Sequence, residues 1–319
     1  MDVLTDVLRT VRMRNVLHGR LELTAPWGAR LDESRHPYFY VISRGVCWLE
    51  VDGLHGSIRT DGGDFVLLTR GQGHVARDAP RTRAVGLDKI LTDHPKDESD
   101  ALHYGGSGPL TSMVCGHFVV EDGGWNPLLE SLPPVVHVKG EDGAAVHWLE
   151  ATLRFVSSEA AAGRPGSKTV LSALADILFI HAARAHLSSS ESGEGGWLRA
   201  LVDPYIGQAL VLLHQYPANA WTVEGLAERV CMSRSAFAER FVQLVGEPPL
   251  QYLTKWRMQK AAALLRDSDA RLAEVAERVG YAGESALSRA FKRWLGVAPG
   301  AYRKGRQGGR ADASRLPDS

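Results

Sequence analysis

The spacing of the hydrophobic positions divides the chain into a first part that predicts strands and a later part that predicts helices. Between residues 46 and 52 apolar and polar side chains alternate, the two-residue period of a strand with one buried face. Glycine- and proline-containing turns separate this segment from similar ones. Short strands between such turns predict a small β-barrel or sandwich. We expect the strands at 21–24, 38–43, 46–51, 64–69 and 113–120.

Helical spacing appears at the amino terminus and again after residue 143. Residues 1–15 carry valines and leucines at helical spacing between charged side chains, which predicts an amphipathic helix and not a signal peptide. Leucines recur at helical spacing through residues 144–187. The stretch SSSESGEGG at 188–196 has the composition of a flexible linker. We expect helices from 197 to 303, followed by a disordered polar tail at 304–319.

The helical segment after residue 196 contains an internal duplication. Val223, Leu226, Ala227 and Val230 follow an i, i+3, i+4, i+7 pattern that returns 49 residues later, beginning at Leu272. A second helix of matching apolar spacing follows each time, at 233–245 and 284–295, after a short turn. Two short helices joined by a tight turn form a helix-turn-helix, whose second helix enters the major groove of DNA. A helical protein-interaction repeat is the alternative interpretation.

The polar positions of each second helix are the candidate DNA contacts. Ser233 is expected to cap the first of these helices. Arg289 has the two-pronged donor geometry that suits a guanine edge, and Glu239 is able to accept from a cytosine amino group. Other cations suit phosphate contacts, which set affinity without specifying sequence. The predicted DNA-binding residues are Ser233, Arg234, Ser235, Ala238, Glu239, Arg240, Arg257, Lys260, Glu284, Ser285, Ser288, Arg289, Lys292 and Arg293.

Residues 249–266 connect the two units and consist of strong helix formers, with proline at the start. A helix of this length spans about 25 Å at ~1.5 Å per residue. Successive major grooves on one face of DNA lie ~34 Å apart. We therefore expect the connector to hold both second helices so that one chain reads two neighbouring grooves.

Charge separates the same two halves, although the whole chain has a formal net charge of zero. Residues 1–196 hold 19 Lys and Arg against 25 Asp and Glu, a balance of −6, whereas residues 197–319 hold 18 against 12, a balance of +6. A basic half suggests an acidic partner such as nucleic acid. The chain has three widely spaced cysteines and no long apolar run. We therefore expect a cytoplasmic protein without a disulfide scaffold or a membrane span.

Six short motifs mark the segment 197–303: WTV at 221–223, MSRS at 232–235, VG at 245–246, WRM at 256–258, VGY at 279–281 and RAFKR at 289–293. With these motifs the segment resembles the DNA-binding domain of the AraC/XylS family of transcription regulators. The resemblance implies binding to double-stranded promoter DNA and contact with RNA polymerase. The segment departs from the family pattern in small ways: Cys231 stands where members often carry glycine, and Leu287 replaces a frequent phenylalanine.

The amino-terminal half contains five further motifs: CWLEVDG at 47–53, GDFVLL at 63–68, CGH at 115–117, NPLL at 126–129 and LPP at 132–134. With these motifs it is similar to the cupin sensor domain that one branch of this family carries. The resemblance implies a small β-barrel that receives a signal, followed by helices that commonly mediate dimerisation. The expected domains are a cupin-like sensor at 1–137, a helical linker and dimerisation region at 138–196, and the DNA-binding domain at 197–303.

Many cupins are metalloenzymes, and a cupin metal site usually needs three histidines and a glutamate. His74 occupies the histidine position of the second cupin motif and His36 lies near the first, which leaves such a site under-ligated. We therefore expect neither a metal nor a cofactor, and place both histidines at the barrel mouth. The alternative is a cupin oxygenase or isomerase with a helical accessory domain.

Cys47 and Cys115 lie in predicted strands, either as small buried side chains or as a redox pair. The pair requires adjacent strands that bring their Cα atoms within ~7 Å. Otherwise the barrel is expected to bind a small organic effector, with Trp48, Tyr38, Tyr40 and Phe65 either lining that site or packing as ordinary core residues. The sequence contains no nucleophile elbow, P-loop or zinc-protease helix. It predicts an α+β, multidomain transcription regulator without enzymatic activity that senses a small molecule or oxidant.

Overall fold

A computed structural model shows two compact units that do not follow the order of the chain. It describes residues 2–304, except residues 12, 99, 121–124, 141–151, 153–154, 157, 160–161, 163 and 190–195. The β-sheet unit comprises the described residues of 14–119 and 132–192. The helical unit comprises those of 1–13, 120–131 and 193–319. Residues 190–195 of the predicted linker and 305–319 of the predicted tail lie outside the described residues, whereas residues 188 and 189 belong to a helix, contrary to the linker prediction.

The β-sheet unit contains two sheets. The six-stranded sheet has the order β11 (Val135–Val138), β6 (Phe65–Leu68), β3 (Tyr38–Arg44), β10 (Leu110–Val120), β1 (Met13–Thr24) and β9 (Ala101–Gly105). The five-stranded sheet has the order β5 (Ile58–Asp61), β4 (Val46–Val51), β7 (His74–Arg77), β2 (Gly28–Leu31) and β8 (Val85–Gly86). The described strands form a sandwich of two hydrogen-bonded sheets and not one closed barrel.

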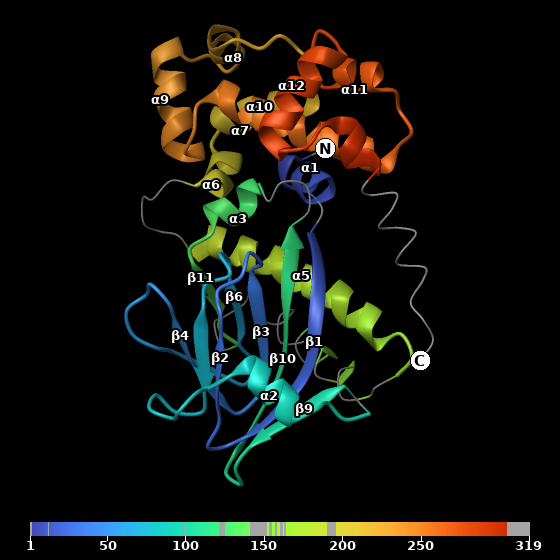
Figure 1. Ribbon diagram of the computed structural model, residues 1–319. Helices are drawn as coiled ribbons and strands as arrows, with labels where there is room; N and C mark the ends of the chain where they lie inside the picture. The colour runs from blue at the N-terminus through green and yellow to red at the C-terminus, as the bar shows by residue number, and fades with distance from the viewer. Residues whose placement is uncertain are drawn as a thin grey trace. The chain divides into compact units, whose positions relative to one another are not determined.

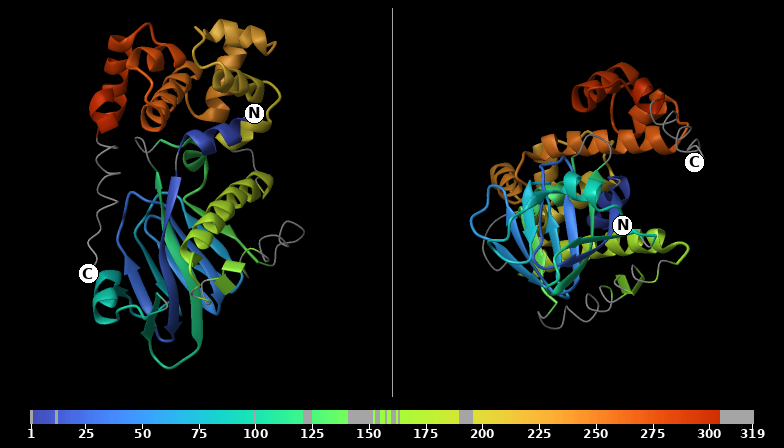
Figure 2. Two further views of the ribbon diagram at one scale, coloured as in Figure 1. Left: turned by 90° about the vertical axis from the view of Figure 1, so that its right-hand side faces the viewer. Right: turned by 60° about the horizontal axis from the view of Figure 1, so that its bottom comes forward.

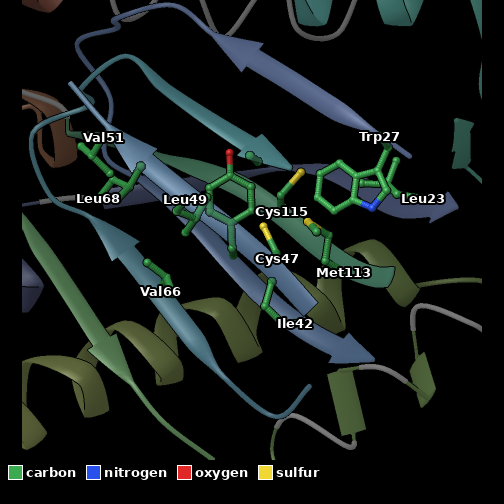
Figure 3. Close-up of a cluster of buried hydrophobic side chains, with 12 residues drawn as sticks. Leu23, Trp27, Ile42, Cys47, Leu49, Val51, Val66, Leu68, Met113 and Cys115 are labelled. Atoms are coloured by element: carbon green, nitrogen blue, oxygen red, sulfur yellow. The ribbon is translucent and has the colours of Figure 1, made fainter. Parts of the chain in front are cut away.

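One buried cluster joins the two sheets. Strand β4 alternates between buried and partly exposed residues, so its apolar side faces the core as the sequence pattern predicts. Figure 3 shows these β4 side chains meeting those of β3, β6 and β10. The other face of the six-stranded sheet carries a second aromatic group, in which Phe118 contacts Phe39 and Phe179. Phe179 belongs to α5 (Ser167–Ser189), the long helix that covers this face in Figure 1. A separate short helix, α2 (Leu87–Asp93), follows β8.

The helical unit is built around a central helix, α10 (Pro249–Asp267). Figure 2 shows α10 between two helix pairs, with α8 and α9 at one end and α11 and α12 at the other. Tyr252, Trp256 and Ala261 on α10 are fully buried. The remaining helices are α1 (Val3–Thr10), α3 (Pro127–Ser131), α6 (Trp197–Val202), α7 (Ile206–Gln215), α8 (Val223–Arg229), α9 (Arg234–Val245), α11 (Leu272–Arg278) and α12 (Glu284–Leu295).

The predicted elements agree with the observed ones most closely in the helical unit. The helices expected at 233–245 and 284–295 occur as α9 and α12, and the connector occurs as α10. The strand at 46–51 is also confirmed, whereas the first strand begins at Met13, eight residues earlier than predicted. None of the described helices is both long enough and apolar enough to cross a membrane.

Candidate nucleic-acid interface

The first helix pair, α8 and α9, has side-chain caps at the start of both helices. The Thr222 hydroxyl accepts a hydrogen bond from the Gly225 amide at 3.0 Å. The Ser233 hydroxyl accepts one from the Ala236 amide at 3.3 Å. Each cap satisfies a backbone donor that the first turn of a helix leaves free. The predicted role of Ser233 as a cap is thus observed.

The second helix pair, α11 and α12, has the same turn but no side-chain cap at either helix start. The second residue after the end of α11 is Gly280, with a φ of +77°, and the matching residue after α8 is Cys231, with a φ of +56°. Both residues are in the left-handed region that glycine enters most easily. The turn geometry is therefore the same in both pairs, although the side chain differs.

Both pairs are held on α10 by phenylalanines on their second helices. Phe241 of α9 is fully buried, with its ring 6.0 Å from that of Tyr252 on α10. Phe291 of α12 is also fully buried, in a cluster with Met258 and Ala261 of α10. Each phenylalanine anchors the inner face of its helix. The opposite faces of α9 and α12 are therefore the exposed ones, as the sequence pattern predicts.

On α9, the two arginines form ion pairs within the helical unit. Arg234 Nε lies 2.5 Å from Glu224 Oε1 on α8. Arg240 lies 2.5 Å from Asp203 Oδ2, and its guanidinium is 5.9 Å from the Tyr205 ring. The exposed face of α9 presents short or acidic side chains, including Ser235 and Glu239, and Ala238 is partly buried. α9 therefore has few long donors that are not already paired.

On α12, the cations are exposed and unpaired. Arg289, Lys292 and Arg293 all face solvent, and none of them forms an ion pair or hydrogen bond with the part of the chain that the structure describes. Glu284 and Ser285 are exposed at the start of the helix, and Ser288 is partly buried. Of the two second helices, α12 is therefore the one whose positive charge is available to a polyanion.

Two further predicted contacts, Arg257 and Lys260, lie on α10 and are engaged within the unit. Arg257 donates hydrogen bonds to the backbone carbonyls of Pro217 and Asn219 at 2.7 and 2.8 Å. Burial lowers the pKa of its guanidinium. Lys260 Nζ donates to Asp6 Oδ1 at 2.6 Å. In this arrangement both side chains support the unit instead of facing outward.

The partner of Lys260 comes from the amino-terminal helix, which is part of the helical unit. α1 packs on α7 and α10. Val3 and Val7 on one side of α1 are buried, as is Val11 directly after it. Asp6 on the same side is 3% exposed. Its Oδ2 accepts a hydrogen bond from His214 Nδ1 on α7 at 3.1 Å. The amphipathic pattern predicted this helix, but nothing in the sequence indicated its partner.

Asp6 ends a buried chain of hydrogen bonds. Trp197 Nε1 donates to the Tyr252 hydroxyl at 2.8 Å, and this hydroxyl lies 2.8 Å from His214 Nε2. A neutral His214 that carries its proton on Nδ1 satisfies every link. Burial lowers the pKa of His214, which favours that neutral form. Burial opposes the charge on Asp6, but hydrogen bonds from His214 and Lys260 lower the pKa of its carboxyl overall.

A second segment from the first half of the chain also packs on α10. Trp125 is 4% exposed, and its carbonyl accepts a hydrogen bond from Gln259 Nε2 at 3.1 Å. The Trp125 ring lies 5.7 Å from that of Tyr252 and 5.6 Å from Lys255 Nζ. Gln259 and Lys260 are consecutive on α10, so α1 and the segment before α3 hold neighbouring residues of one helix.

In the β-sheet unit, Cys47 and Cys115 lie in opposite sheets. Cys47 is on β4 and Cys115 on β10, so the expected adjacent strands are wrong. Both thiols are free and belong to one buried cluster, as Figure 3 shows. Burial raises the pKa of each thiol to about 12. Since the thiolate is the reactive form, both cysteines have the environment of unreactive core residues.

The aromatic residues expected to line an effector site divide between different faces. Tyr40 and Tyr38 belong to the core cluster or contact it. Trp48 alternates with the buried residues of β4 and is only partly buried, so it lies on the outer face of its sheet. Phe65 stacks on Phe39 at 6.4 Å, on the side of the six-stranded sheet that α5 covers. Trp48 and Phe65 therefore do not face the space between the sheets, and Phe65 is an ordinary core residue, the alternative expected for these aromatics.

The two candidate histidines have different surroundings. His74 is fully buried; its Nδ1 lies 2.8 Å from the Gln72 carbonyl and its Nε2 lies 2.5 Å from the Tyr40 hydroxyl. His36 stacks on His117 at 5.0 Å, and His117 Nδ1 lies 2.9 Å from His18 Nε2. Burial and the two neighbouring imidazoles lower the pKa of His117 to about 4. Among the described residues, no group of three His, Cys, Asp or Glu side chains has the geometry of a metal site.

Two helix-turn-helix pairs on one connecting helix, together with a two-sheet unit, define a DNA-binding protein that carries a second, β-rich domain. Comparisons with known proteins agree. A cupin family model matches residues 2–188, and a helix-turn-helix domain model matches residues 226–305.

The chain is also similar to named regulators along most of its length. It is 39% identical over 306 residues to a putative AraC-like transcription regulator of Streptomyces lividans. This alignment covers 95% of this chain and 98% of that protein. It is 35% identical over 246 residues to the transcriptional regulator AlkR of Acinetobacter baylyi. That alignment covers 76% of this chain and 79% of AlkR. Among solved structures, the DNA-binding domain of AdpA in complex with a target DNA is 38% identical, with a TM-score of 0.32 over 34% of this chain and 97% of that one. The chain belongs to the AraC-like transcription regulators.

Proposed function

We propose that the protein regulates transcription by binding promoter DNA through α9 and α12. The observation that supports this most strongly is that Arg289, Lys292 and Arg293 on α12 are exposed and form no ion pair with any residue in the described ranges. In this proposal α12 supplies base readout through Arg289 and phosphate contacts through Lys292 and Arg293. α9 contributes through its helix start at Ser233 and through the short and acidic side chains at Ser235, Ala238 and Glu239.

The DNA-binding proposal is tested with the full chain and a pool of random duplexes. Repeated rounds of binding and amplification should enrich one asymmetric sequence whose two conserved parts lie about one helical turn apart. Binding of that sequence should weaken steeply with salt, because phosphate contacts release counterions. If no sequence is enriched, or if the affinity is independent of salt, the proposal is wrong.

The β-sheet unit is proposed to receive a small-molecule signal. The buried, high-pKa thiols of Cys47 and Cys115 make an oxidant a poor trigger. The polar cluster of His18, His36 and His117 offers hydrogen-bonding groups to an organic effector instead. Labelling the native protein with a thiol reagent, with and without hydrogen peroxide, separates the two signals. Protection of either buried cysteine by peroxide would favour redox sensing.

The route of the signal is proposed to follow the two segments that pack on α10. Residues 1–13 lead directly into β1, and residues 120–131 follow β10, which neighbours β1 in the six-stranded sheet. Asp6 and Trp125 within these segments contact Lys260 and Gln259. A shift of either strand would thus reach the helix that spaces the two recognition helices.

The Asp6→Asn substitution tests this route, since it keeps the shape of the side chain and removes its charge. We expect it to change promoter affinity and to weaken the effect of the signal. Asp88→Asn on the exposed start of α2 is the matched control. An unchanged response in Asp6→Asn would contradict the route but not the DNA-binding proposal.

The remaining proposals concern partners. We propose that the protein acts in the cytoplasm without enzymatic activity, contacts RNA polymerase at its promoters, and forms a homodimer. Its named relatives are transcription regulators, which supports the absence of catalysis. Sedimentation of the purified chain tests the dimer.

A further inference from the structure

A cavity lies within the helical unit, outside both the β-sheet unit and the predicted DNA contacts. Its volume is about 330 Å³, which is in the range of small-molecule sites. Three parts of the chain form its walls: α3, the start of α6, and the last turn of α9 with the following residues. Tyr252 of α10 also lines it.

The walls combine apolar surface with negative charge. Trp197, Pro127 and Leu244 supply apolar surface, whereas Glu130 and Glu247 contribute carboxylates. The cavity also contains the carboxyl end of α9, where the helix dipole places partial negative charge on the last carbonyl groups. A ligand for such a site needs a positive charge and an apolar body.

The neighbourhood already holds one internal cation. Lys255 Nζ lies 2.9 Å from Glu247 Oε2, and it lies 5.6 Å and 5.9 Å from the rings of Trp125 and Trp294. One lysine faces two carboxylates, so Glu130 is in excess. Partial burial raises the pKa of Glu130 most, and the charge of Glu247 adds to this effect. Together they outweigh Lys255 and a hydrogen bond with Trp125, which lower the pKa. A second cation would lower it further.

We infer that this cavity binds a small organic ammonium or guanidinium compound, with its charge at Glu130 and its apolar body against Trp197 and Pro127. The site goes beyond the proposed function, because it takes a ligand that neither DNA binding nor the β-sheet unit requires. Glu130 is accessible from solvent, so a ligand that reaches this carboxylate displaces only water.

The position of the cavity connects its occupant to the DNA-binding elements. Trp197 and Tyr252 in its wall begin the hydrogen-bond chain that continues through His214 to Asp6 of α1. The last turn of α9 also lines the cavity. A bound ligand therefore stabilises α3 against α9 and also stabilises the docking of α1.

The experiment titrates the full chain with phenethylamine by calorimetry. 2-Phenylethanol, which has the same body without charge, and 3-phenylpropanoate, which has the opposite charge, serve as comparison compounds. We expect phenethylamine to bind at millimolar concentration or below, the alcohol to bind at least about tenfold more weakly, and the carboxylate not to bind.

Two variants locate the site. Glu130→Gln removes the excess carboxylate at constant size and should weaken phenethylamine binding by about tenfold. Glu228→Gln removes an exposed carboxylate of α8 in the same unit and should leave the binding unchanged. Hydrogen exchange of residues 2–11 should slow when phenethylamine is bound to the unmodified chain.

Three results would overturn the inference. One is the absence of phenethylamine binding at millimolar concentration, and another is equal binding of phenethylamine and 2-phenylethanol. The third is an equal effect of Glu130→Gln and Glu228→Gln. Circular dichroism of the Glu130→Gln chain establishes that it is folded, so that a loss of binding is assigned to the missing charge.

Discussion

The two helix-turn-helix pairs share one backbone plan but differ in what their second helices present. In the first pair, Arg234 and Arg240 are tied to Glu224 and Asp203, and Ser233 caps the helix. In the second pair, Arg289 and its two basic neighbours are exposed and unpaired within the described chain. The two pairs therefore share the same packing but differ in charge. The arginines of α9 form ion pairs within the helical unit, whereas the cations of α12 are exposed and available to DNA.

The largest expected effect concerns the packing that the two helix-turn-helix pairs share. Phe241→Ala and Phe291→Ala each remove a fully buried ring, and each should lower the free energy of unfolding by about 3–5 kcal/mol. Urea unfolding followed by circular dichroism measures both. Val242→Ala on the exposed face of α9 is the control and should change stability by less than about 0.5 kcal/mol. A large loss in only one phenylalanine variant would show that the two cores are not equivalent.

The next prediction tests the division of charge. Arg289→Ala should weaken binding to the selected duplex by about 1–3 kcal/mol and relax the preference at one base pair. Arg234→Ala should have a smaller effect, because its ion pair with Glu224 is already in place in the free protein. Fluorescence anisotropy at constant salt measures both variants. A greater loss for Arg234→Ala would reverse the roles assigned to α9 and α12.

A third prediction compares the two turns. Gly280→Ala should destabilise the protein by about 1–2 kcal/mol or more, because its φ is +77° and a Cβ would lie 2.6 Å from the Ala218 carbonyl oxygen. Cys231→Gly should instead raise stability slightly, by up to about 1 kcal/mol, since it relieves the same backbone strain. Thermal unfolding measures both changes. Opposite signs are expected, and equal signs would contradict a common turn geometry.

The smallest effects concern the helix starts. Ser233→Ala removes the cap of α9 and should cost about 1 kcal/mol of stability. Gly283→Ser should add a few tenths of a kcal/mol to α12, where no side-chain cap exists and a Cβ would meet no atom within 4 Å. Urea unfolding under identical conditions gives the two differences. A stabilising Ser233→Ala change would show that the observed cap contributes nothing.

The sequence was most informative where local spacing decides the structure. The apolar repeat predicted α9 and α12 to within one residue, and alternation predicted β4, because each pattern reports which face of its own element is buried. It also predicted that α1 is helical. Spacing within one element does not identify the element on the other side of a contact, however.

What the sequence left out follows from that limit. Arg240, Arg257 and Lys260 are predicted DNA contacts, and spacing alone did not reveal their internal partners at Asp203, Pro217 and Asp6, which lie 37 or more residues away in the chain. The interior position expected for Trp48 required knowledge of which face of β4 meets the other sheet. The cavity beside α9 is assembled from three separate segments and leaves no local signal.

The docking of α1 has a practical consequence for anyone who studies the carboxy-terminal fragment alone. A polypeptide cut at residue 197 loses the valine side of α1 and the carboxylate that neutralises Lys260, and so exposes an apolar strip beside an uncompensated ammonium group. Such a fragment should self-associate at high concentration. Appending residues 2–11 through a Gly/Ser tether, in the manner of a circular permutation, should restore a monodisperse preparation.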